Sequence, residues 1–397
     1  MAWPIIKLGE ICEERKDKNV KNENLPVFTV SHIYGLIPYQ NIFYKQIHSK
    51  NTTNYKIVNH DDFVFGLPTK NTLPFGYLDK KDKVLVSPAY VVFLIKNKNL
   101  LFPKFLFYLF KTDYYKWRII EIAKSQSATR HGLPLKFHHL SNLEIPLPPL
   151  SVQEKIVKIL DAIQEAVDIQ EKIIEKTKEL KKSMMANLFK YGGPSFRKER
   201  KLKKTEIGEI PENWEVARLG EVIEIFDSKR IPLSEEQRRD MKGKYPYCGA
   251  NGIIDYINNY IFDGEYVLLA EDGGYWGPFE ESAYIMKGKF WVNNHAHIFK
   301  AIENKTINFF LMNVLNYLDL NDYISGATRG KLNQSIMKDI KIPLPPLSEQ
   351  QEIAEILQTI DQKIEIEKKK KELYEELFKT MLNKIMNQEI DIEKVEI

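Results

Sequence analysis

The stretch IPLPPLS occurs twice in this sequence, at residues 145–151 and at residues 342–348, so the two copies lie 197 positions apart. Proline lacks a backbone N–H and biases the residue before it away from helix, so each motif ends the segment that precedes it. Ser151 and Ser348 then stand at the expected N-cap of a following helix, and a Glu or Gln three residues later completes a capping box. A repeat of this length predicts a chain built from two related halves.

Each copy of the motif runs into a long helix-forming segment, residues 152–189 and residues 349–386. Both segments repeat apolar side chains every seven residues, which is typical of a coiled coil. At 1.5 Å per residue each helix would be about 57 Å long. A narrow apolar stripe is only marginally stable alone, so we expect each helix to pack against the other copy.

The heptads predict two seams along the first helix. One seam begins at Ile156 and contains the polar residues Gln170 and Thr177, which can fix the register of the pair. The second seam begins three residues later at Ile159, and neighbouring apolar residues such as Leu160 widen the stripe. The spacer coiled-coil residues that we nominate are Ile156, Ile159, Ile163, Ile173, Leu180, Ile353, Ile356, Ile360, Ile364 and Leu377.

Length and composition are those of an ordinary soluble protein. The 397 residues are 43% apolar and 28% charged, which allows two or more packed domains. The formal net charge is only +4, so a nucleic-acid partner would require basic residues to be concentrated locally. Cys12 and Cys248 form neither a disulfide framework nor a zinc site. Because no signal peptide and no membrane-length apolar run is present, we expect a cytoplasmic location and no membrane contact.

The motifs divide the chain into five segments. Residues 1–150 and 205–347 contain short apolar runs broken by Pro, Gly and Asn, so we interpret each as an α+β domain. Residues 151–189 form the first long helix, and residues 348–397 form the second helix with a C-terminal tail. Residues 190–204 are a basic linker with a Gly-Gly-Pro start, which we interpret as a solvated tether.

Motifs for catalysis are missing from the sequence. It has no GxxxxGK[ST] phosphate loop and no dinucleotide-binding glycine turn, and residues 272–274 (DGG) indicate only a turn. His295 and His297 lie two residues apart, but no further metal ligand can be nominated, so a hydrogen-bonded structural pair is favoured over a metal site. We therefore expect no catalytic residues, no bound metal and no enzyme activity from this chain alone.

A polar loop that occurs in both halves indicates binding instead. Residues 127–133 (SATRHGL) and 326–332 (GATRGKL) place Arg130 and Arg329 at matching positions beside hydroxyl and glycine residues, which suits a phosphate clamp. The alternative is that this loop only packs against the following strand. Asn and Gln side chains can read adenine, and Arg and Lys can read guanine. The DNA-binding residues that we nominate are Lys124, Gln126, Ser127, Thr129, Arg130, His131, Asn251, Asn293, Asn294, His295, Thr328, Arg329, Lys331 and Asn333.

With these features together, the sequence resembles the specificity subunits of type I restriction–modification enzymes over essentially its whole length. The motifs that carry the resemblance are EIGEIPENWEVARLGEV (206–222), YCGANGIIDYINNYIFDGEYVLLAEDG (247–273), FWVNNHAHIF (290–299), GATRGKL, and above all IPLPPLSxQ twice. The counterparts in the first half are looser, with LVSPAYVVF at residues 85–93 where the second half has NNHAHIF. The two halves are therefore expected to read different sequences.

The resemblance implies two target-recognition domains, each reading one half of a bipartite site in double-stranded DNA, and two antiparallel spacer helices that set the gap between the halves. It also implies two methyltransferase (M) subunits as partners and restriction (R) subunits in the full complex. S-adenosylmethionine, ATP and Mg are then expected on those partners, and no cofactor on this chain. Overlapping helices of this length would place the half-site centres on the order of 12–15 base pairs apart.

Three other functions remain open. A type IIB specificity protein would share the fold and differ in its partners. A coiled-coil scaffold whose end domains bind proteins would not show steeply salt-dependent DNA binding. A self-sufficient methyltransferase or nuclease would need the cofactor and metal motifs that are absent.

Overall fold

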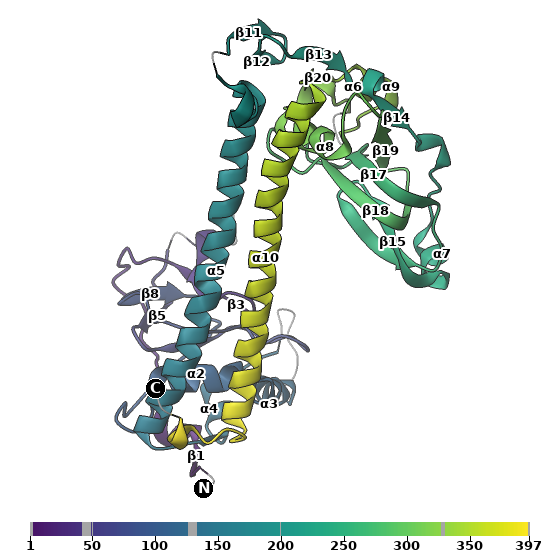
Figure 1. The fold of residues 1–397 in the computed structure, drawn as a ribbon. Coiled ribbons are helices and arrows are strands. Elements are labelled where there is room, and N and C mark those ends of the chain that lie inside the picture. The colour runs from purple at the N-terminus through teal and green to yellow at the C-terminus, as the bar shows by residue number, and fades with distance from the viewer. Residues whose placement is uncertain are drawn as a thin grey trace. The chain divides into compact units, whose positions relative to one another are not determined.

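The chain folds into two compact units, and each unit contains one α+β domain and one half of each long helix (Figure 1). The computed structural model describes residues 3–41, 49, 51–125, 133–198, 200–326 and 330–395. Unit 1 comprises Met1–Ile169 and Lys371–Ile397, and unit 2 comprises Gln170–Lys370. The expected fold class, two α+β domains with two long helices and an internal repeat, is confirmed.

Unit 1 is built around a four-stranded antiparallel sheet with the strand order β2-β9-β6-β7. In its aromatic core the rings of Phe63, Phe65, Phe75 and Phe93 stack on one another. The ring of Phe110, in α2 (Pro103–Lys111), packs edge-on against Phe75. The elements are β1 (Ile5–Lys7), α1 (Leu8–Ile11), β2 (Cys12–Glu14), β3 (Phe28–Ser31), β4 (Gly35–Pro38), η1 (Tyr39–Asn41), β5 (Lys56–Asn59), β6 (Phe63–Phe65), β7 (Phe75–Tyr77), β8 (Lys83–Val86), β9 (Val91–Ile95), α2 (Pro103–Lys111), α3 (Asp113–Lys124), α4 (Phe137–Leu140) and β10 (Glu144–Pro146).

Unit 2 contains a six-stranded sheet with the strand order β14-β19-β17-β18-β15-β16. All neighbouring strands are antiparallel except β15 and β18, which are parallel. The elements are η2 (Pro194–Phe196), β11 (Leu202–Thr205), β12 (Gly208–Pro211), β13 (Glu215–Arg218), α6 (Leu219–Val222), β14 (Ile223–Ile225), η3 (Asp227–Lys229), α7 (Glu235–Asp240), β15 (Lys242–Gly249), β16 (Gly252–Ile257), β17 (Phe262–Ala270), β18 (Ala283–Val292), β19 (Ala296–Ala301), α8 (Asn308–Tyr317), η4 (Asn321–Tyr323), α9 (Gln334–Asp339) and β20 (Lys341–Leu344).

The two domains repeat the same joint at their long helices. Strands β1 and β10 pair antiparallel in unit 1, and β13 and β20 do so in unit 2. In each unit the leucine of the LGE motif donates its backbone N–H to the residue directly before the last strand of the domain. Leu8 N donates to Leu143 O and Leu219 N to Ile340 O, both over 2.8 Å. The repeat read from the sequence therefore extends to backbone hydrogen bonds.

The long helices α5 (Leu150–Tyr191) and α10 (Leu347–Met386) begin one residue before the expected N-cap serines. The carbonyl of Pro149 accepts the first-turn amides of Val152 and Gln153, and Pro346 does the same in the second copy. Ser151 and Ser348 lie inside the first turn, so the predicted capping boxes are wrong. A proline can fill the cap position because this position needs no backbone N–H donor.

The glutamine two residues after each serine is the residue that joins domain to helix. The buried Gln153 amide donates to Leu100 O (2.9 Å) and Pro148 O (2.8 Å) and accepts from Phe102 N (2.8 Å). Its counterpart Gln350 donates to Lys305 O (3.0 Å) and Pro345 O (2.9 Å) and accepts from Thr306 Oγ1 (2.8 Å). Each glutamine thereby fixes its helix to the domain that precedes it in the chain.

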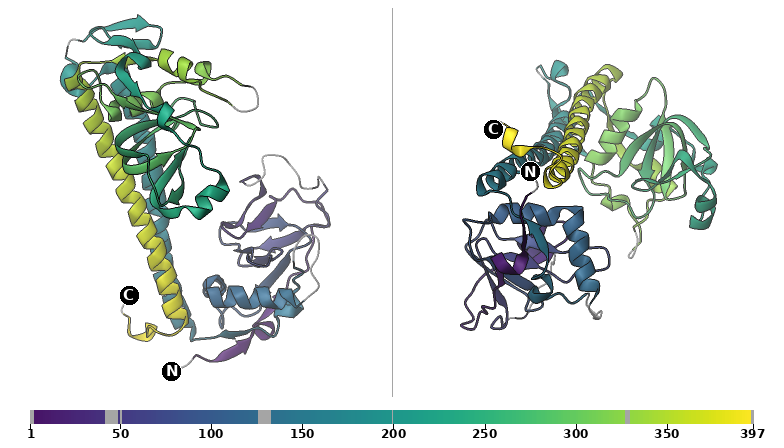
Figure 2. Two further views of the ribbon diagram at one scale, coloured as in Figure 1. Left: turned by 90° about the vertical axis from the view of Figure 1, so that its right-hand side faces the viewer. Right: turned by 90° about the horizontal axis from the view of Figure 1, so that it is seen from below.

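In each unit the segments of α5 and α10 run antiparallel (Figure 2). Buried residues on α5 follow the first predicted seam at Ile156 and Gln170, but the second seam lies four residues on, at Leu160 and Val167. Among the nominated spacer residues, Ile156, Ile353 and Ile364 are buried, and Ile159, Ile163, Ile356 and Ile360 are half-buried. The nomination of Ile173, Leu180 and Leu377 is wrong, because they are 37%, 52% and 44% exposed.

The segment expected to be a solvated tether is held in unit 2 by a buried carboxylate. Arg200 Nη2 donates to Glu349 Oε2 over 2.8 Å, and the same carboxylate accepts from Trp214 Nε1 (2.9 Å) and Gly193 N (3.0 Å). Glu349 is completely buried at the start of α10. Within the part of the chain that the structure describes, no helix is long and apolar enough to cross a lipid bilayer.

Candidate nucleic-acid interface

Backbone and side-chain hydrogen bonds bring four segments of unit 2 together, and we call them the loop cluster. They are residues 249–252, 271–277, 293–295 and 330–333. Asn251 Nδ2 donates to Gly273 O (3.0 Å), and Gly273 N donates to Gly330 O (3.3 Å). Leu332 N donates to Glu271 O over 2.7 Å. We call residues 127–133 and 326–332 the first and second Arg loops, and the part of the second Arg loop that follows residues 327–329 is therefore tied to a neighbouring loop.

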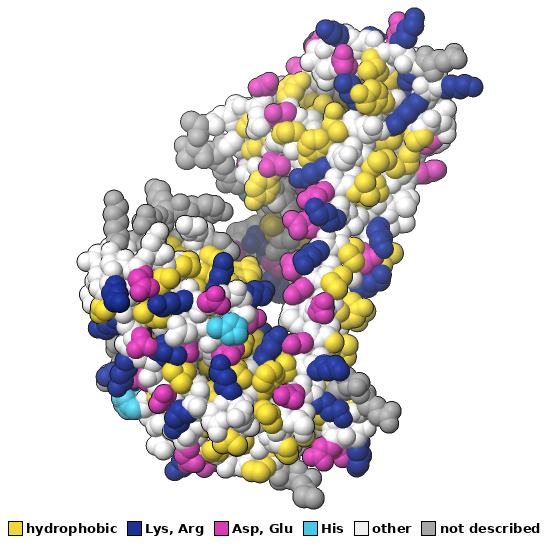
Figure 3. Space-filling view, turned by 90° about the vertical axis from the view of Figure 1, so that its left-hand side faces the viewer, with side chains coloured by type: hydrophobic (Ala, Val, Ile, Leu, Met, Phe, Trp, Pro, Cys, Tyr) yellow, Lys and Arg dark blue, Asp and Glu magenta, His cyan; other side chains and the backbone are white. Residues whose placement is uncertain are grey.

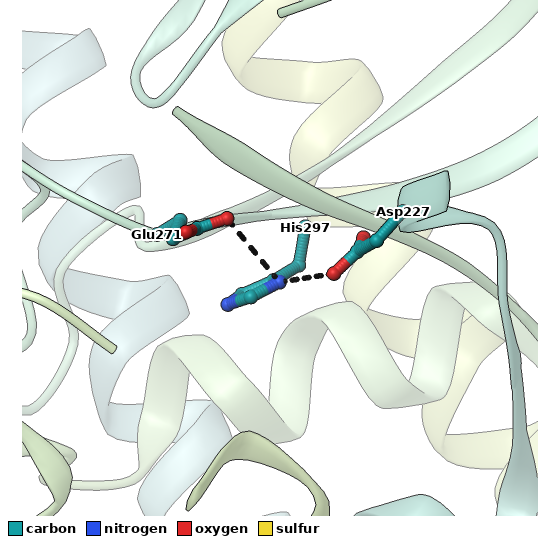
Figure 4. Close-up of side chains that lie close together, drawn as sticks. All are labelled: Asp227, Glu271 and His297. Atoms are coloured by element: carbon teal, nitrogen blue, oxygen red, sulfur yellow. Dashed lines mark hydrogen bonds and ion pairs between the residues drawn. The ribbon is translucent and has the colours of Figure 1, made fainter. Parts of the chain in front are cut away.

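A group of buried charges lies beneath the loop cluster (Figure 4). His297, on β19, places Nδ1 2.6 Å from Asp227 Oδ2 and Nε2 2.8 Å from Leu332 O. Its Nδ1 also lies 3.7 Å from Glu271 Oε2. Arg230 donates to the same Glu271 oxygen over 2.6 Å. We call Asp227, Arg230, Glu271 and His297 the polar cluster.

Neighbouring groups of the protein already neutralise the charges of the polar cluster and accept its hydrogen bonds. Asp227, Glu271 and His297 offer ligand atoms that lie within 4.8 Å of one another, which is the geometry that a metal site requires. However, the Arg230 guanidinium already supplies a positive charge to Glu271 and lies 3.5 Å from Asp227. Both His297 ring nitrogens also face acceptors. The donor set therefore favours a hydrogen-bonded structural role, as we inferred for the histidine pair.

Asp227 is the best-connected member of the polar cluster. Burial opposes its ionisation, but hydrogen bonds from His297, Gln334 Nε2 (2.8 Å) and Ile298 N (2.9 Å) outweigh burial and lower the pKa of Asp227. The charged carboxylate thereby connects β19 to α9, the helix that begins directly after residues 330–333. This connection positions the end of the second Arg loop.

The structure brings several nominated residues to the surface of the loop cluster. Asn251, Asn294 and Lys331 are exposed, and Lys331 lies 3.3 Å from Glu271 Oε1. His295 is 39% exposed and its Nδ1 lies 2.8 Å from Asp272. Asn333 is also exposed, at the N-cap position of α9. These side chains form a polar surface in the loop cluster, and Lys331, paired with Glu271, is its cationic member.

Asn293 does not belong to that surface. It is only 4% exposed, its Oδ1 accepts a hydrogen bond from His295 N over 2.8 Å, and its backbone N donates to Cys248 O over 3.0 Å. A buried side chain that already satisfies a backbone amide cannot also reach a base. The nomination of Asn293 as a DNA contact is therefore wrong, and its role is to shape the turn that presents Asn294 and His295.

In unit 1 the structure describes only the residues that flank the first Arg loop (127–133) and its last residue, Leu133. Lys124, at the end of α3, is exposed, lies 5.6 Å from the Trp117 ring centroid and 3.6 Å from Glu121. After the loop, Leu133 N donates to Pro68 O over 2.8 Å. The nominated residues that lie outside the described residues are Gln126, Ser127, Thr129, Arg130, His131, Thr328 and Arg329, so their DNA contacts stay predictions.

The sequence reading missed the polar cluster except for His297. Asp227 and Glu271 stand 70 and 26 residues before His297, and no local motif connects them. The usable signal was the alternation in NNHAHIF, which directs His297 and Phe299 to the same side of β19 and hence into the protein. A histidine in that position requires acceptors, and carboxylates were the obvious class to search for.

The family described as "Type I restriction modification DNA specificity domain" matches residues 2–179 and 211–376 of this chain. The MjaVIII specificity subunit of a type I restriction enzyme from Methanocaldococcus jannaschii is 29% identical over 99% of this chain and 94% of its own length. The putative MjaX specificity subunit from the same organism is 31% identical over 79% of this chain and 74% of its own length.

Two solved structures have the same fold. The crystal structure of a type I restriction–modification S subunit from M. genitalium aligns with a TM-score of 0.57 at 15% identity, over 96% of this chain and 95% of that one. A chain from a study of complex assembly in the type I R–M system aligns with a TM-score of 0.56 at 18% identity, over 97% of both. The two-part match of the family and the full-length relatives lead to one conclusion: the chain belongs to the family of type I restriction–modification DNA specificity subunits.

Proposed function

We propose that each α+β domain reads one half of a bipartite DNA target. The observation that carries this proposal is that both Arg loops end in the same backbone bond, Leu133 N to Pro68 O and Leu332 N to Glu271 O. The two domains therefore hold the end of this loop in the same way, and the sequence of each loop carries an Arg beside hydroxyl and glycine residues, which suits phosphate binding. Different side chains around each loop then give the two half-sites different sequences.

The long helices act as the spacer that sets the distance between the two DNA half-sites. Each domain directly precedes its helix in the chain, and Gln153 and Gln350 fix that joint by three hydrogen bonds each. A joint of this kind transmits the position of a helix to its domain without a flexible hinge. The length and register of the helix pair then determine the gap between the half-sites.

Two equivalent partners dock on apolar side chains that the helices leave exposed (Figure 3). We call each set an outer stripe. On α5 it contains Ile169, Ile173 and Leu180, and on α10 it contains Ile366, Leu373 and Leu377, all between 37% and 64% exposed. Ile366 follows Ile169 by 197 positions, and Leu377 follows Leu180 by the same number, so two of the three positions in each stripe match within the repeat. Exposed apolar rows of this kind mark protein contacts.

Methyltransferase subunits are the partners that fit two copies of one surface. They would carry S-adenosylmethionine, and restriction subunits would add ATP and Mg chemistry, while this chain contributes recognition and no catalysis. A type IIB specificity protein is distinguished by its partners, and a protein-binding scaffold by a lack of salt-dependent DNA binding.

The outer stripes give a stoichiometry test. Leu180→Asp should remove one of two bound methyltransferase subunits, Leu377→Asp should remove the other, and the double variant should bind none, because a buried unpaired carboxylate opposes docking. Native mass spectrometry of the purified complexes measures the count. Lys178→Asp changes an exposed residue within the same turn as Leu180 but outside the outer stripe, so it should weaken binding far less and serves as the control. Two subunits retained by the double variant would exclude the outer stripes as docking sites.

Methylation mapping tests the recognition role directly. The chain is expressed with its neighbouring methyltransferase, and single-molecule sequencing records modified bases across the genome. A bipartite motif with a methylated adenine in each half and one fixed gap is expected. A continuous motif, or no motif with an assembled complex, would contradict the proposal.

A further inference from the structure

The loops that follow β6 in unit 1 and β17 in unit 2 each lie beside the Arg loop of the same unit. In unit 1 it connects β6 to β7 and includes residues 67–73, and in unit 2 it connects β17 to β18 and includes residues 271–277. The equivalence is set by hydrogen bonds: Pro68 O and Glu271 O are the acceptors for the leucine that ends each Arg loop. We call these two segments the companion loops.

In unit 1 the companion loop is closed on itself, which fixes its tip. Thr69 N donates to Thr72 O over 2.9 Å, and the two threonine hydroxyls lie 2.7 Å apart. The tip residues between them, Lys70 and Asn71, are exposed. Their side chains have no hydrogen-bond or ion-pair partner among the described residues. A fixed tip therefore presents one cation and one amide to solvent.

In unit 2 the companion loop is fixed from below by a buried aromatic ring. Trp276 is 7% exposed, and its carbonyl accepts from Leu320 N over 2.8 Å. Gly274 and Gly330 allow the close packing, since an added Cβ would lie 2.3 Å from Ala270 Cβ and 2.7 Å from the Trp276 ring, respectively. Tyr275, directly before this anchor, is 62% exposed.

The two tips differ in chemistry although their scaffolds match. Lys70 and Asn71 are of the types that recognise guanine and adenine edges, whereas Tyr275 offers an aromatic face for thymine methyl groups and one hydroxyl. In unit 2 Asn251 Nδ2 donates to Gly273 O and Gly273 N donates to Gly330 O, so the exposed Tyr275 lies in the same loop cluster as the nominated residues. Matched scaffolds with unmatched tips suit two half-sites of different sequence.

We propose that the companion loops read bases, with Lys70 and Asn71 specifying one half-site and Tyr275 specifying the other. This inference rests on the proposed function, because it requires that each domain reads one half of a bipartite target. It adds specificity residues that lie outside the Arg loops. The tips act on separate halves, so each change should affect one half only.

The test uses the full chain with its methyltransferase and a plasmid library that randomises each base of both half-sites. Lys70→Ala with Asn71→Ala should lower discrimination at one or more bases of one half-site by on the order of 10- to 100-fold and leave the other half and the gap unchanged. Tyr275→Ala should do the same in the opposite half. Because the tips are exposed, melting temperatures should remain at the wild-type value.

Matched controls separate base reading from general effects. Lys80→Ala and Tyr256→Ala change exposed residues of the same types elsewhere in the two domains and should leave both half-sites intact. Asn71→Leu and Tyr275→Leu repeat the test with side chains closer in size. Unchanged half-sites, relaxation of both halves together, or a uniform loss of methylation on all sequences would each overturn the inference. A wild-type complex that recognises no bipartite motif would instead overturn the proposed function.

Discussion

Asp227 accepts hydrogen bonds from two elements of unit 2, β19 and α9, and the lowered pKa of its carboxyl makes its contribution to stability depend on pH. Since the folded pKa lies below the unfolded value of about 3.9, its stabilisation is fully present above about pH 4 and is lost as the pH falls through the folded pKa. Asp227→Asn leaves His297 without its charged partner and should cost about 3 kcal/mol in the free energy of unfolding at pH 7.

Chemical denaturation of the full chain at pH 7 and at pH 3 measures this effect. The difference between Asp227→Asn and wild type should narrow at the lower pH, because wild type then loses the same ionic contribution. Asp240→Asn, at an exposed position on α7, should show no difference at either pH. A gap of equal size at both pH values would show that the charge of Asp227 does not matter.

The nominated residues show what the sequence can and cannot say about single side chains. Asn251, His295 and Lys331 were chosen from motifs far apart in the chain, and the structure gathers them in one loop cluster. Asn293 was chosen from the same motif and is buried, because residue type alone does not tell an amide that faces DNA from one that caps a turn. Tyr275 was overlooked because its neighbours read only as a turn.

At the scale of elements, the repeat and the long helices were predictable because seven-residue periodicity and proline breaks are local signals. The second seam was placed one residue early for a physical reason. Apolar residues occupy both the third and fourth positions after Ile156, Ile163 and Gln170, as at Ile159 and Leu160, so periodicity could not choose between them. Leu160 and Val167, at the fourth position, are buried, whereas Ile173, at the third position, is 37% exposed and belongs to the outer stripe.

The helix pair contains a polar contact between matching positions of the two repeats. Gln170 and Glu367 are 197 residues apart, so the same position of each repeat meets its copy, and Gln170 Nε2 donates to the Glu367 carboxylate. The hydrogen bond from Lys363, opposed by burial and aided by Gln170 and Lys370, lowers the pKa of Glu367 to about 2. Thr177, the other polar residue of the seam, bonds to Ile173 O of its own helix instead (2.7 Å).

A double-mutant cycle should show that this contact is coupled. Gln170→Leu should lower the melting temperature, because it removes a donor from a buried carboxylate, whereas Gln170→Leu with Glu367→Leu should restore or exceed it through apolar packing. Because the folded pKa of Glu367, about 2, lies below its unfolded value, its ionic contribution is fully present above about pH 4.5, so the ranking should hold from pH 5 to pH 8. Gln362→Leu, at an exposed position on α10, is the control. Additive effects would contradict the coupling.

At the scale of the whole molecule, connectivity assigns one helix to each domain. The first domain leads into α5 and the second into α10, and matching glutamines fix both joints. Each compact unit then combines its domain with part of both helices. The fold class and the repeat could be predicted from the sequence. The division into units could not, since it depends on contacts between segments that are far apart in the sequence.

If the helix pair sets the gap, equal shortening of both helices should change the gap and leave both half-site sequences unchanged, even though the removed segments contain one residue of each outer stripe. Removing the heptad before Gln170 (residues 163–169) and the heptad after Glu367 (residues 368–374) shortens both helices equally and retains the Gln170–Glu367 contact. Seven residues correspond to about 10.5 Å of helix, or about 3 base pairs at 3.4 Å each. Methylation mapping should therefore return both half-sites unchanged with a gap shorter by about this number. Replacing the same heptads by other helix-forming heptads of equal length should keep the original gap, whereas altered half-site sequences after the deletion would show that the helices contribute to base reading and are more than a spacer.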